Sequence, residues 1–331
     1  MSGCSRRLRT AHLWTGRLRQ DEPVRPSLAD ALAAGVVVLD GGLSTELEAA
    51  GHDVSTSLWS ARLLRDDPDA VAAAHRRFFD AGARVGTTAS YQASADGFGT
   101  LGLDRAQADA LTSSSVALAA RARSEAGLDD AAWVAASVGP YGAVLADGSE
   151  YTGGYVDTMD VLALRRFHRP RLEVLAAAGA DALACETLPA AAEVEALLLE
   201  LAALDVPAWV SLTTVVDPHS VVRTRRGEPA ADVFAMAADV ACVVAVGVNC
   251  LDPRAVTASV RAAAGAGKPV LAYPNSGEQW DASTRTWTGS GTSTWTDLDD
   301  WTAAGARLIG GCCRVGPDRI ADLAARLAPA S

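Results

Sequence analysis

The sequence predicts a single α/β domain of the (β/α)8 barrel type, and three observations lead to that prediction. Short apolar runs rich in β-branched residues recur eight times along the 331 residues, helix-like segments separate them, and polar residues follow the runs at one end. Nearly continuous apolar runs are typical of parallel strands that are covered on both faces. Eight strand and helix units match the repeat of this barrel, whose active sites form at the carboxyl ends of the strands.

The expected elements follow from these runs and from the residues between them. Glycine directly follows the expected helices 69–81 and 159–178, and proline opens those at 189–204 and 317–327, which are ordinary end and start signals. The eight expected strands are 36–40, 84–90, 133–139, 181–187, 208–214, 243–249, 269–275 and 307–313.

An open doubly wound sheet would also alternate strands and helices, but its nucleotide-binding glycines should follow the first strand directly. The one GxGxxG match, at Gly97, Gly99 and Gly102, trails the second expected strand instead. No phosphate-binding P-loop, no GxSxG nucleophile elbow and no internal repeat is present. Dinucleotide, nucleotide and serine-hydrolase chemistry are therefore disfavoured.

Composition and charge exclude several other classes of protein. Forty acidic residues against 29 basic ones give a formal net charge of -11, and the body of the chain has no basic stretch, so nucleic acid is not an expected partner. No apolar run approaches the ~18 residues that would cross a membrane. We expect a cytoplasmic protein, while the sequence leaves its oligomeric state open.

The first 26 residues differ from the rest, because they carry six arginines and only two acids. We expect residues 1–26 to form a disordered extension, with a transit-like peptide as the alternative, and residues 27–331 to form the barrel domain.

Three of the six cysteines fall at ends of expected strands. Cys250 ends the sixth strand, and Cys312 and Cys313 end the eighth after two glycines. Three thiolates that meet at one barrel mouth would suit Zn²⁺ with a fourth position open for a substrate. The alternative is that these cysteines are small buried hydrophobic residues, as Cys185 and Cys242 are expected to be.

Adjacent cysteines cannot both face one side of a strand, since successive side chains alternate. We therefore expect the strand to end at about Gly311, with Gly310 and Gly311 adopting the unusual backbone angles that turn both sulfurs toward a metal.

None of the five histidines ends an expected strand, so a histidine ligand or a Ser-His-Asp triad is not expected. His75 and His168 are expected on helix surfaces. A metal held by three thiolates is a weak Lewis acid, but it still removes the proton of a bound thiol. Alkyl transfer to a thiol is thus favoured over hydrolysis.

Seven motifs in order resemble the homocysteine S-methyltransferase family, over residues of about 36 to 325. They are LDGGLSTEL at 39–47, LWS at 58–60, TASYQ at 88–92, SVGPYG at 137–142, GVNC at 247–250, YPNSGE at 273–278 and GGCCR at 310–314.

This resemblance implies a (β/α)8 barrel that binds zinc through three cysteines and takes homocysteine as the fourth ligand. It also implies that Asp40 and Glu186 hold the amino acid end of homocysteine, whose carboxylate would accept hydrogen bonds from the Gly41-Gly42 turn. The full set of expected site residues is Cys250, Cys312 and Cys313 for the metal, and Asp40, Gly41, Gly42, Glu186, Asn249, Trp59, Tyr91 and Tyr141 for the substrates.

The methyl donor is inferred from one departure from the family pattern. In the betaine branch an aromatic residue follows the fourth-strand glutamate, whereas this chain has Thr187. This favours a sulfonium donor, S-methylmethionine or S-adenosylmethionine. Cobalamin-dependent relatives need further modules, for which the chain has no room.

Three aromatic residues are candidates for a cation–π contact with the positively charged donor. Trp59 is the first choice, followed by Tyr91 or Tyr141, and the alternative is that these rings pack at the barrel rim.

A Gly/Ser/Thr-rich segment after the seventh strand carries Trp280, Trp287, Trp295 and Trp301. We expect it to close over the mouth and exclude water, or else to fill gaps between loop and helix.

The predicted function is zinc-dependent methyl transfer to homocysteine, which gives methionine. The alternatives are a betaine-type or selenohomocysteine-type enzyme of the same family, a non-catalytic barrel that binds zinc or thiols, and a barrel hydrolase.

Overall fold

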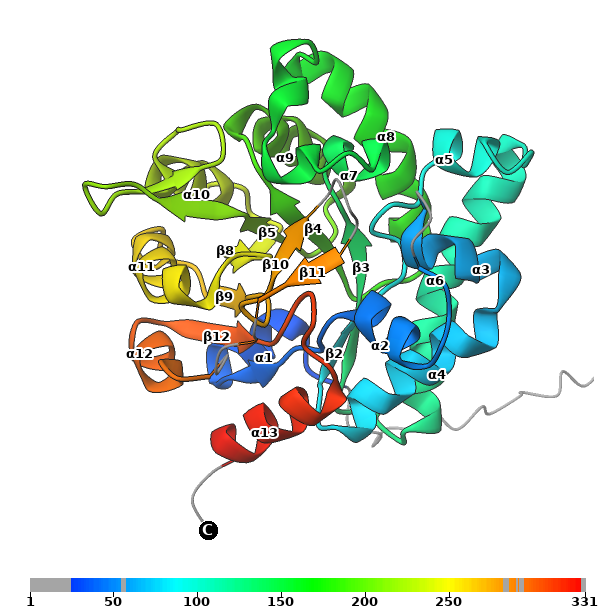
Figure 1. The fold of residues 1–331 in the computed structure, drawn as a ribbon, viewed down its shortest axis with the longest axis horizontal. Helices are drawn as coiled ribbons and strands as arrows, with labels where there is room; N and C mark the ends of the chain where they lie inside the picture. Colours follow the sequence, from blue (N-terminus) through cyan, green and yellow to red (C-terminus); the bar gives the residue numbers. More distant parts are fainter. Residues whose placement is uncertain (1–24, 55–57, 282–285, 290, 292–294, 329–331) are drawn as a thin grey trace, which may run out of the picture.

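The computed structural model describes residues 25–54, 58–281, 286–289, 291 and 295–328, without the side chains of residues 59, 279–281, 286 and 287. Its centre is a sheet of eight parallel strands in the order β1-β12-β9-β8-β5-β4-β3-β2 (Figure 1). A parallel bridge between Leu39 and Val85 joins the two edges, so the sheet closes on itself. The predicted (β/α)8 barrel is confirmed.

Each of the eight predicted runs overlaps one barrel strand. The strands are β1 (Val37–Val38), β2 (Val85–Thr87), β3 (Trp133–Val138), β4 (Ala182–Leu188), β5 (Ala208–Leu212), β8 (Val243–Asn249), β9 (Val270–Tyr273) and β12 (Ala306–Ile309). Two small antiparallel hairpins stand outside the barrel: β6 (Thr214–Val216) with β7 (Val222–Thr224), and β10 (Gln279–Asp281) with β11 (Thr286–Thr288).

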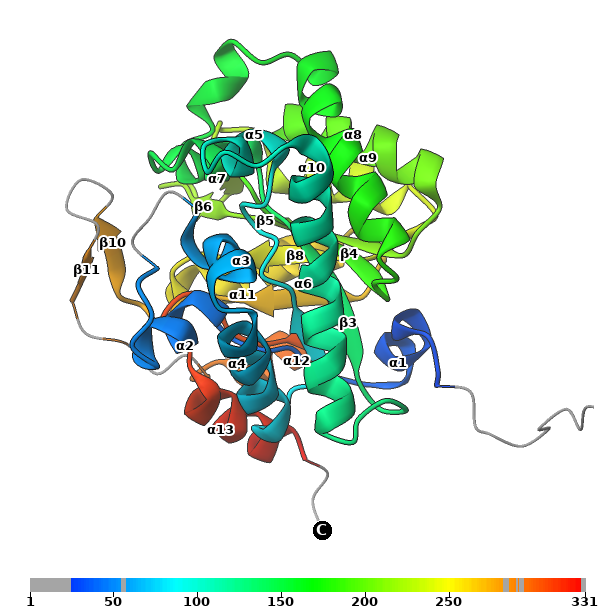
Figure 2. The ribbon, with the colours of Figure 1, turned by 90° about the vertical axis from the view of Figure 1, so that its right-hand side faces the viewer.

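Helices cover the outside of the barrel (Figures 1 and 2). The larger ones are α4 (Pro68–Asp80), α6 (Arg105–Glu125), α8 (Val161–Ala177), α9 (Ala191–Leu204), α10 (Ala230–Ala238), α11 (Pro253–Ala264) and α13 (Pro317–Leu327). Shorter helices are α1 (Leu28–Ala34), α2 (Leu43–Ala49), α3 (Leu63–Asp66), α5 (Ala95–Gly99), α7 (Tyr141–Leu145), α12 (Leu298–Ala303), η1 (Trp59–Arg62), η2 (Ser149–Tyr151) and η3 (Gly154–Asp157).

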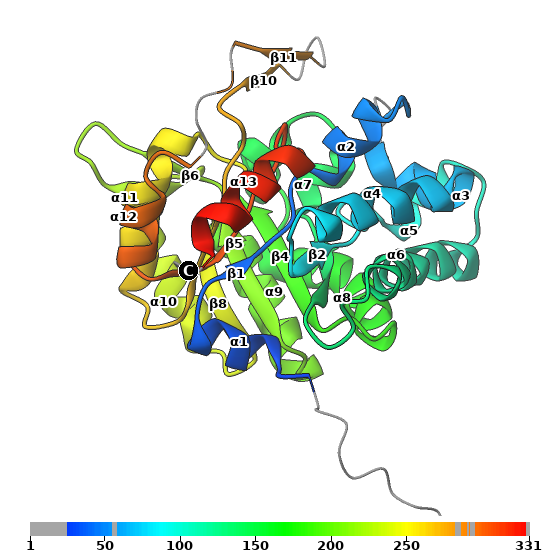
Figure 3. The same ribbon diagram turned by 90° about the horizontal axis from the view of Figure 1, so that it is seen from below.

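Alternate residues of the strands fill the barrel interior. The large rings of Trp133 and Trp209 face small alanines there, which is how a barrel of eight strands is filled without voids. At the amino end of the strands, Leu28 and Leu32 of α1 join this interior cluster. Figure 3 shows α1 at this end and the β10–β11 hairpin at the opposite end. Helix α1 therefore covers the amino end of the barrel, and the carboxyl end is open for a cavity.

Local signals explain where the outer helices begin. Asp67 and Asp160 cap α4 and α8 with their carboxylates, and Pro68 occupies the first turn of α4. The apolar faces of these helices pack on the strand residues that point outward.

The placement of two histidines contradicts the sequence-based prediction. His75 and His168 were expected on helix surfaces, but they are 1% and 0% exposed. His168 is bonded to Glu193, 2.9 Å away on α9. His75 has no hydrogen-bond partner for either ring nitrogen in the described structure. A single polar residue does not interrupt the apolar periodicity of a helix face, so the sequence pattern cannot separate a buried imidazole from an exposed one.

The tryptophan-rich segment after β9 contains a hairpin, β10–β11, and a part that packs against the outer helices. Trp295 and Trp301 are buried, and their indole N–H groups donate to Arg319 O on α13 and Thr257 Oγ1 on α11. These two tryptophans therefore fill the space between loop and helices. Trp280 and Trp287 pair across the β10–β11 hairpin, and their side chains lie outside the described structure. Whether this hairpin closes over the mouth stays a prediction.

At the amino terminus, residues 1–24 lie outside the described structure, so the disorder expected for residues 1–26 stays a prediction for that part. The last residues of that segment contact the barrel: Arg25 pairs with Asp181, and Trp133 Nε1 donates to Pro26 O. Among the described residues, no helix is long and apolar enough to cross a membrane.

The unpartnered His75 makes stability depend on pH in a defined direction. Burial lowers the pKa of His75 from 6.5 to about 4, so below pH 6.5 the unfolded chain binds a proton that the folded chain does not. This contribution to stability is lost as the pH falls from about 6.5 toward 4. Lowering the pH from 7 to 5 should reduce the free energy of unfolding of both the wild type and the His75→Leu variant. The reduction should be about 2 kcal/mol smaller in His75→Leu, because the variant has no histidine to protonate at this position.

Urea unfolding at both pH values measures this difference. The matched control is His219→Leu at an exposed histidine, which should retain the wild-type pH dependence. Equal falls in the wild type and in His75→Leu would contradict the assignment.

Candidate metal and substrate site

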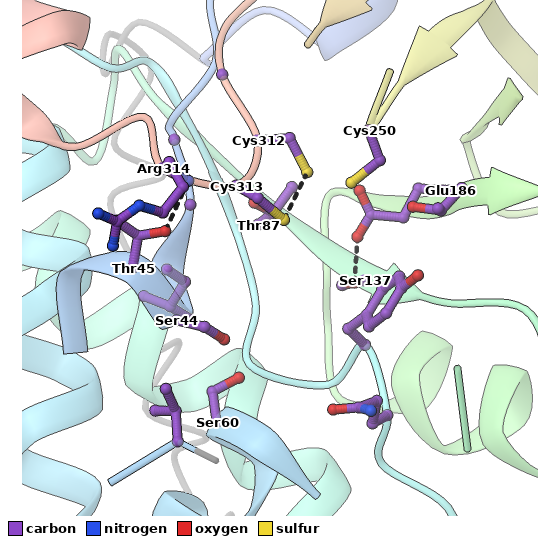
Figure 4. Close-up of a pocket in the computed structure, with 18 of the residues that line it drawn as sticks. Ser44, Thr45, Ser60, Thr87, Ser137, Glu186, Cys250, Cys312, Cys313 and Arg314 are labelled. Carbon is purple, nitrogen blue, oxygen red and sulfur yellow. Dashed lines mark hydrogen bonds between the residues drawn. The ribbon is translucent and has the colours of Figure 1, made fainter. Parts of the chain in front are cut away.

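A cavity of about 540 Å³ opens at the carboxyl ends of the strands. It is lined by residues at the carboxyl ends of β2, β3, β4 and β9 and in the segments that follow β1, β2, β3, β8 and β12. Figure 4 shows three cysteine sulfurs and the carboxylate of Glu186 directed into it. This is the end of the barrel at which the sequence predicts the site.

Three thiols form a compact cluster in this cavity. Cys250 follows β8, and Cys312 and Cys313 follow β12. Their sulfur atoms all lie within 4.8 Å of one another, and Cys312 Sγ and Cys313 Sγ are 4.0 Å apart. Within the described residues, this is the only group of three or more cysteine, histidine or acidic side chains that could hold a metal ion.

The loop that presents the two adjacent cysteines differs from the expectation in one respect. Gly310 and Gly311 do not have positive φ, and the left-handed residue is Arg314 at φ 64°. The glycines are needed for close packing instead. A Cβ at Gly310 would lie 2.6 Å from Asp40 O, and one at Gly311 would lie 2.2 Å from Val315 Cγ1. The strand ends at Ile309, two residues before the predicted end.

The donor set of the cluster fits Zn²⁺. Thiolates at about 2.3 Å from a tetrahedral zinc lie about 3.8 Å from one another. Cys312 Sγ and Cys313 Sγ are 4.0 Å apart, and all three sulfurs lie within 4.8 Å of one another. Hydrogen bonds from the thiols of Cys250 and Cys312 hold the pKa of Cys313 well below its usual range. The cluster therefore favours a thiolate, the form that binds metals.

Glu186 reaches the cavity because strand β4 is irregular at this point. The register of β4 against β5 shifts between Cys185 and Leu188, and Thr187 has φ 61°. Asn249 holds this conformation: its Oδ1 accepts from Thr187 N, and its Nδ2 donates to Thr187 Oγ1, both at 2.7 Å. Such a bulge re-aims a neighbouring side chain. Asn249 itself is fully buried and does not line the cavity.

Two hydroxyl groups orient the Glu186 carboxylate. Ser137 Oγ donates to one oxygen, and Tyr273 OH donates to the other at 2.9 Å. Burial raises the pKa of Glu186 to about 7. Both hydroxyl residues occur in the motifs quoted above, but the sequence does not reveal what they bind.

Gly41 and Gly42 line the cavity, whereas Asp40 does not. Asp40 is 1% exposed, does not line the cavity, and accepts from Thr87 N and Thr87 Oγ1 at 2.7 Å. Burial raises its pKa to about 8. Gly41 and Gly42 do line the cavity, but the Gly42 N–H already donates to Val315 O at 2.9 Å. Asp40 thus fixes Thr87, which lines the cavity beside it.

Of the two aromatic residues expected to contact a donor whose side chains the structure describes, one lines the cavity. Tyr91 does so, and burial raises its pKa. Tyr141 packs against Tyr155 and Phe167, with ring centroids at 5.5 and 5.0 Å, outside the cavity lining. Trp59 begins η1, but its side chain lies outside the described structure, while the adjacent Ser60 lines the cavity.

The sequence-based prediction missed several cavity residues. His52 lines the cavity although no histidine was expected at the mouth. Glu150 and Tyr151 also line it, and the Tyr151 hydroxyl lowers the pKa of Cys313. All three lie in loops or a short 3-10 turn, where neither periodicity nor strand ends give a signal.

The fold and the site together define a (β/α)8 barrel with a metal-binding trio of cysteines at its mouth. The family model described as homocysteine S-methyltransferase matches residues 37–327. The chain therefore belongs to the homocysteine S-methyltransferase family.

Individual relatives agree with this assignment. The chain is 45% identical over 319 residues to homocysteine S-methyltransferase of Escherichia coli, covering 93% of this chain and all of that protein. It is 40% identical to homocysteine S-methyltransferase YbgG of Bacillus subtilis, over 88% of this chain and 94% of the relative. The metallated form of the homocysteine methyltransferase MmuM from Escherichia coli matches with a TM-score of 0.78 and 44% identity, over 88% of this chain and 96% of that one.

The cluster geometry predicts which cysteines bind metal. Cys250→Ser, Cys312→Ser and Cys313→Ser should each lower zinc affinity by about tenfold or more, because each removes one thiolate ligand. Competition with a colorimetric zinc chelator, together with elemental analysis of purified protein, measures the affinity. Cys242→Ser is the control, since Cys242 is half-buried outside the cavity and should retain wild-type affinity. Wild-type zinc affinity in all three site variants would rule out the cluster as the metal site.

Proposed function

We propose that this protein is a zinc-dependent enzyme that transfers a methyl group from a sulfonium compound to the thiol of homocysteine, forming methionine. The observation that carries the proposal is the trio of Cys250, Cys312 and Cys313 at the cavity of a barrel of this family. S-methylmethionine and S-adenosylmethionine are the proposed donors.

Zinc held by the three cysteines would take the substrate thiol at its fourth position and remove the thiol proton near neutral pH. The protein supplies the rest of the site. Tyr151 and Thr187 line the cavity beside the sulfurs, and their hydroxyl groups act to lower the pKa values of Cys313 and Cys250 respectively.

Homocysteine would be held at its amino acid end by Glu186. This carboxylate is already oriented by Ser137 and Tyr273, so it can accept from an ammonium group without reorganising. Thr87, fixed by Asp40, supplies a further polar group on the same wall of the cavity. The thiol would then be directed at the three sulfurs.

The cavity also suits a cationic donor. The carboxylates of Glu48, Glu150 and Glu186 line it against a single arginine among the described residues, Arg314. Arg314 is itself paired with Glu48 and Glu278. The residue after Glu186 is Thr187 rather than an aromatic residue, which favours a sulfonium over betaine.

In the reaction, the bond between the donor methyl carbon and the sulfonium sulfur breaks as a bond from that carbon to the homocysteine sulfur forms. The leaving sulfide keeps the electron pair and departs uncharged, so no general acid is needed. The contribution of the chain is alignment of the two sulfurs and exclusion of water.

A second candidate concerns the acceptor. The chain is 39% identical, over 88% of its length, to a relative named selenocysteine Se-methyltransferase from Brassica oleracea. A selenol is a softer nucleophile than a thiol and suits the same metal, so selenohomocysteine is a candidate acceptor alongside homocysteine. A cytoplasmic location is part of the proposal, because free thiols persist in reducing compartments.

Metal removal combined with a donor panel tests the proposal. Zinc-loaded protein should convert homocysteine to methionine with S-methylmethionine or S-adenosylmethionine, and should be inactive with betaine. Chelation should abolish turnover, and zinc should restore it. Methionine formation is followed by mass spectrometry with a deuterated donor methyl group.

Full activity of metal-free protein would contradict the zinc dependence. Activity with betaine alone would contradict the sulfonium donor. Tight zinc binding with no turnover of any donor would favour the non-catalytic barrel.

A further inference from the structure

Glu150 is a buried carboxylate in the cavity for which the site described so far has no use. It lies in η2 (Ser149–Tyr151), in the long connection between β3 and α8, and is 6% exposed. It lines the same cavity as Cys250 and Cys313. Its Oε2 atom is buried and has no hydrogen-bond partner in the described structure.

The other buried carboxylates in this half of the molecule have donors. Asp40 accepts from Thr87, Glu186 from Ser137 and Tyr273, and Glu193 from a backbone N–H and two side chains. Burying a carboxylate oxygen without a partner is costly, because the hydration it loses is not replaced. Glu150 is therefore the buried carboxylate that is poised to gain most from a cation entering the cavity.

The fold holds Glu150 in place. Glu193 of α9 accepts from Tyr141 N at 2.7 Å and from the Tyr155 hydroxyl, on either side of Glu150 in sequence. His168 of α8 hydrogen-bonds to the same carboxylate. The turn is also closely packed, since a Cβ at Gly142 would lie 2.5 Å from Glu150 N. The backbone that carries Glu150 is thus held in place before any ligand arrives.

The position of Glu150 relative to the thiols indicates which cation it meets. Glu150 lines the same cavity as Cys250, Cys312 and Cys313, so its carboxylate and the thiols border one space. The donor methyl carbon must come about 3 to 3.5 Å from the acceptor sulfur before it can react. The donor sulfur is bonded to that carbon, so it lies one methyl group further away. The donor's positive sulfur is therefore delivered beside the thiol cluster, whereas its amino acid end lies further away.

We propose that Glu150 binds the sulfonium centre of the methyl donor and so selects cationic sulfur donors. This inference rests on the proposed function and names the residue that recognises one of its two substrates. Glu186 then serves homocysteine and Glu150 serves the donor, so each carboxylate of the inner cavity has one cationic partner.

Glu150→Gln in the zinc-loaded enzyme tests this division, because it keeps the shape and removes the charge. The KM for S-methylmethionine and the inhibition constant of trimethylsulfonium should both rise by about tenfold or more, as for loss of one partner of a buried charge pair. The KM for homocysteine should stay within about twofold of the wild-type value. Glu150→Asp keeps the charge and should retain most of the donor affinity.

Two controls accompany this variant. Glu186→Gln should show the reverse pattern, with a raised KM for homocysteine and a nearly unchanged inhibition constant for trimethylsulfonium. Glu195→Gln removes an exposed carboxylate from α9 outside the cavity and should leave both constants unchanged.

Three outcomes would overturn the proposal. Unchanged donor constants in Glu150→Gln, with an active wild type, would refute the role of Glu150 and leave the proposed function standing. A loss confined to S-methylmethionine, with trimethylsulfonium unaffected, would assign Glu150 to the donor's ammonium group instead. A wild-type enzyme that neither binds nor turns over any sulfonium would refute the proposed function and this inference together.

Discussion

The site depends on the meeting of two loops that are 62 residues apart in sequence, one carrying Cys250 and the other Cys312 and Cys313. Strand β9 lies between β8 and β12 in the sheet, so the two loops rise on either side of one strand. Cys250 at φ 50° and Arg314 at φ 64° adopt left-handed backbone conformations, which non-glycine residues take only when the surroundings impose them. The barrel thus supplies the constraint that brings the sulfurs within one ligand sphere.

The same constraint shapes the electrostatics around the sulfurs. Two buried acids are held by hydroxyl groups near the sulfurs: Ser137 and Tyr273 hold Glu186, which lines the cavity, and Thr87 holds Asp40 behind the cavity wall. Burial raises the pKa of each of these carboxyls, so their anionic forms gain from a cationic partner. A cavity of this kind favours positively charged ligands and disfavours free anions. Homocysteine and a sulfonium donor both carry positive charge, which the lining carboxylates Glu186 and Glu150 could receive.

The sequence predicts the parts of this structure that follow from periodicity and strand ends. The eight strands and the convergence of Cys250 with Cys312 and Cys313 were predictable, because parallel strands place their carboxyl ends on one face. The bulge at Thr187 and its support by Asn249 were not, since they arise from pairing between strands distant in the chain. Glu150 was missed because a short turn inside a long loop carries no repeating pattern.

X-ray absorption at the zinc edge of the loaded protein, before and after addition of homocysteine, tests the central claim most directly. The thiol trio predicts a first shell with three sulfur ligands from the protein, which becomes a shell of four sulfurs when homocysteine binds. A spectrum that homocysteine does not change, or a first shell dominated by nitrogen and oxygen, would contradict the account.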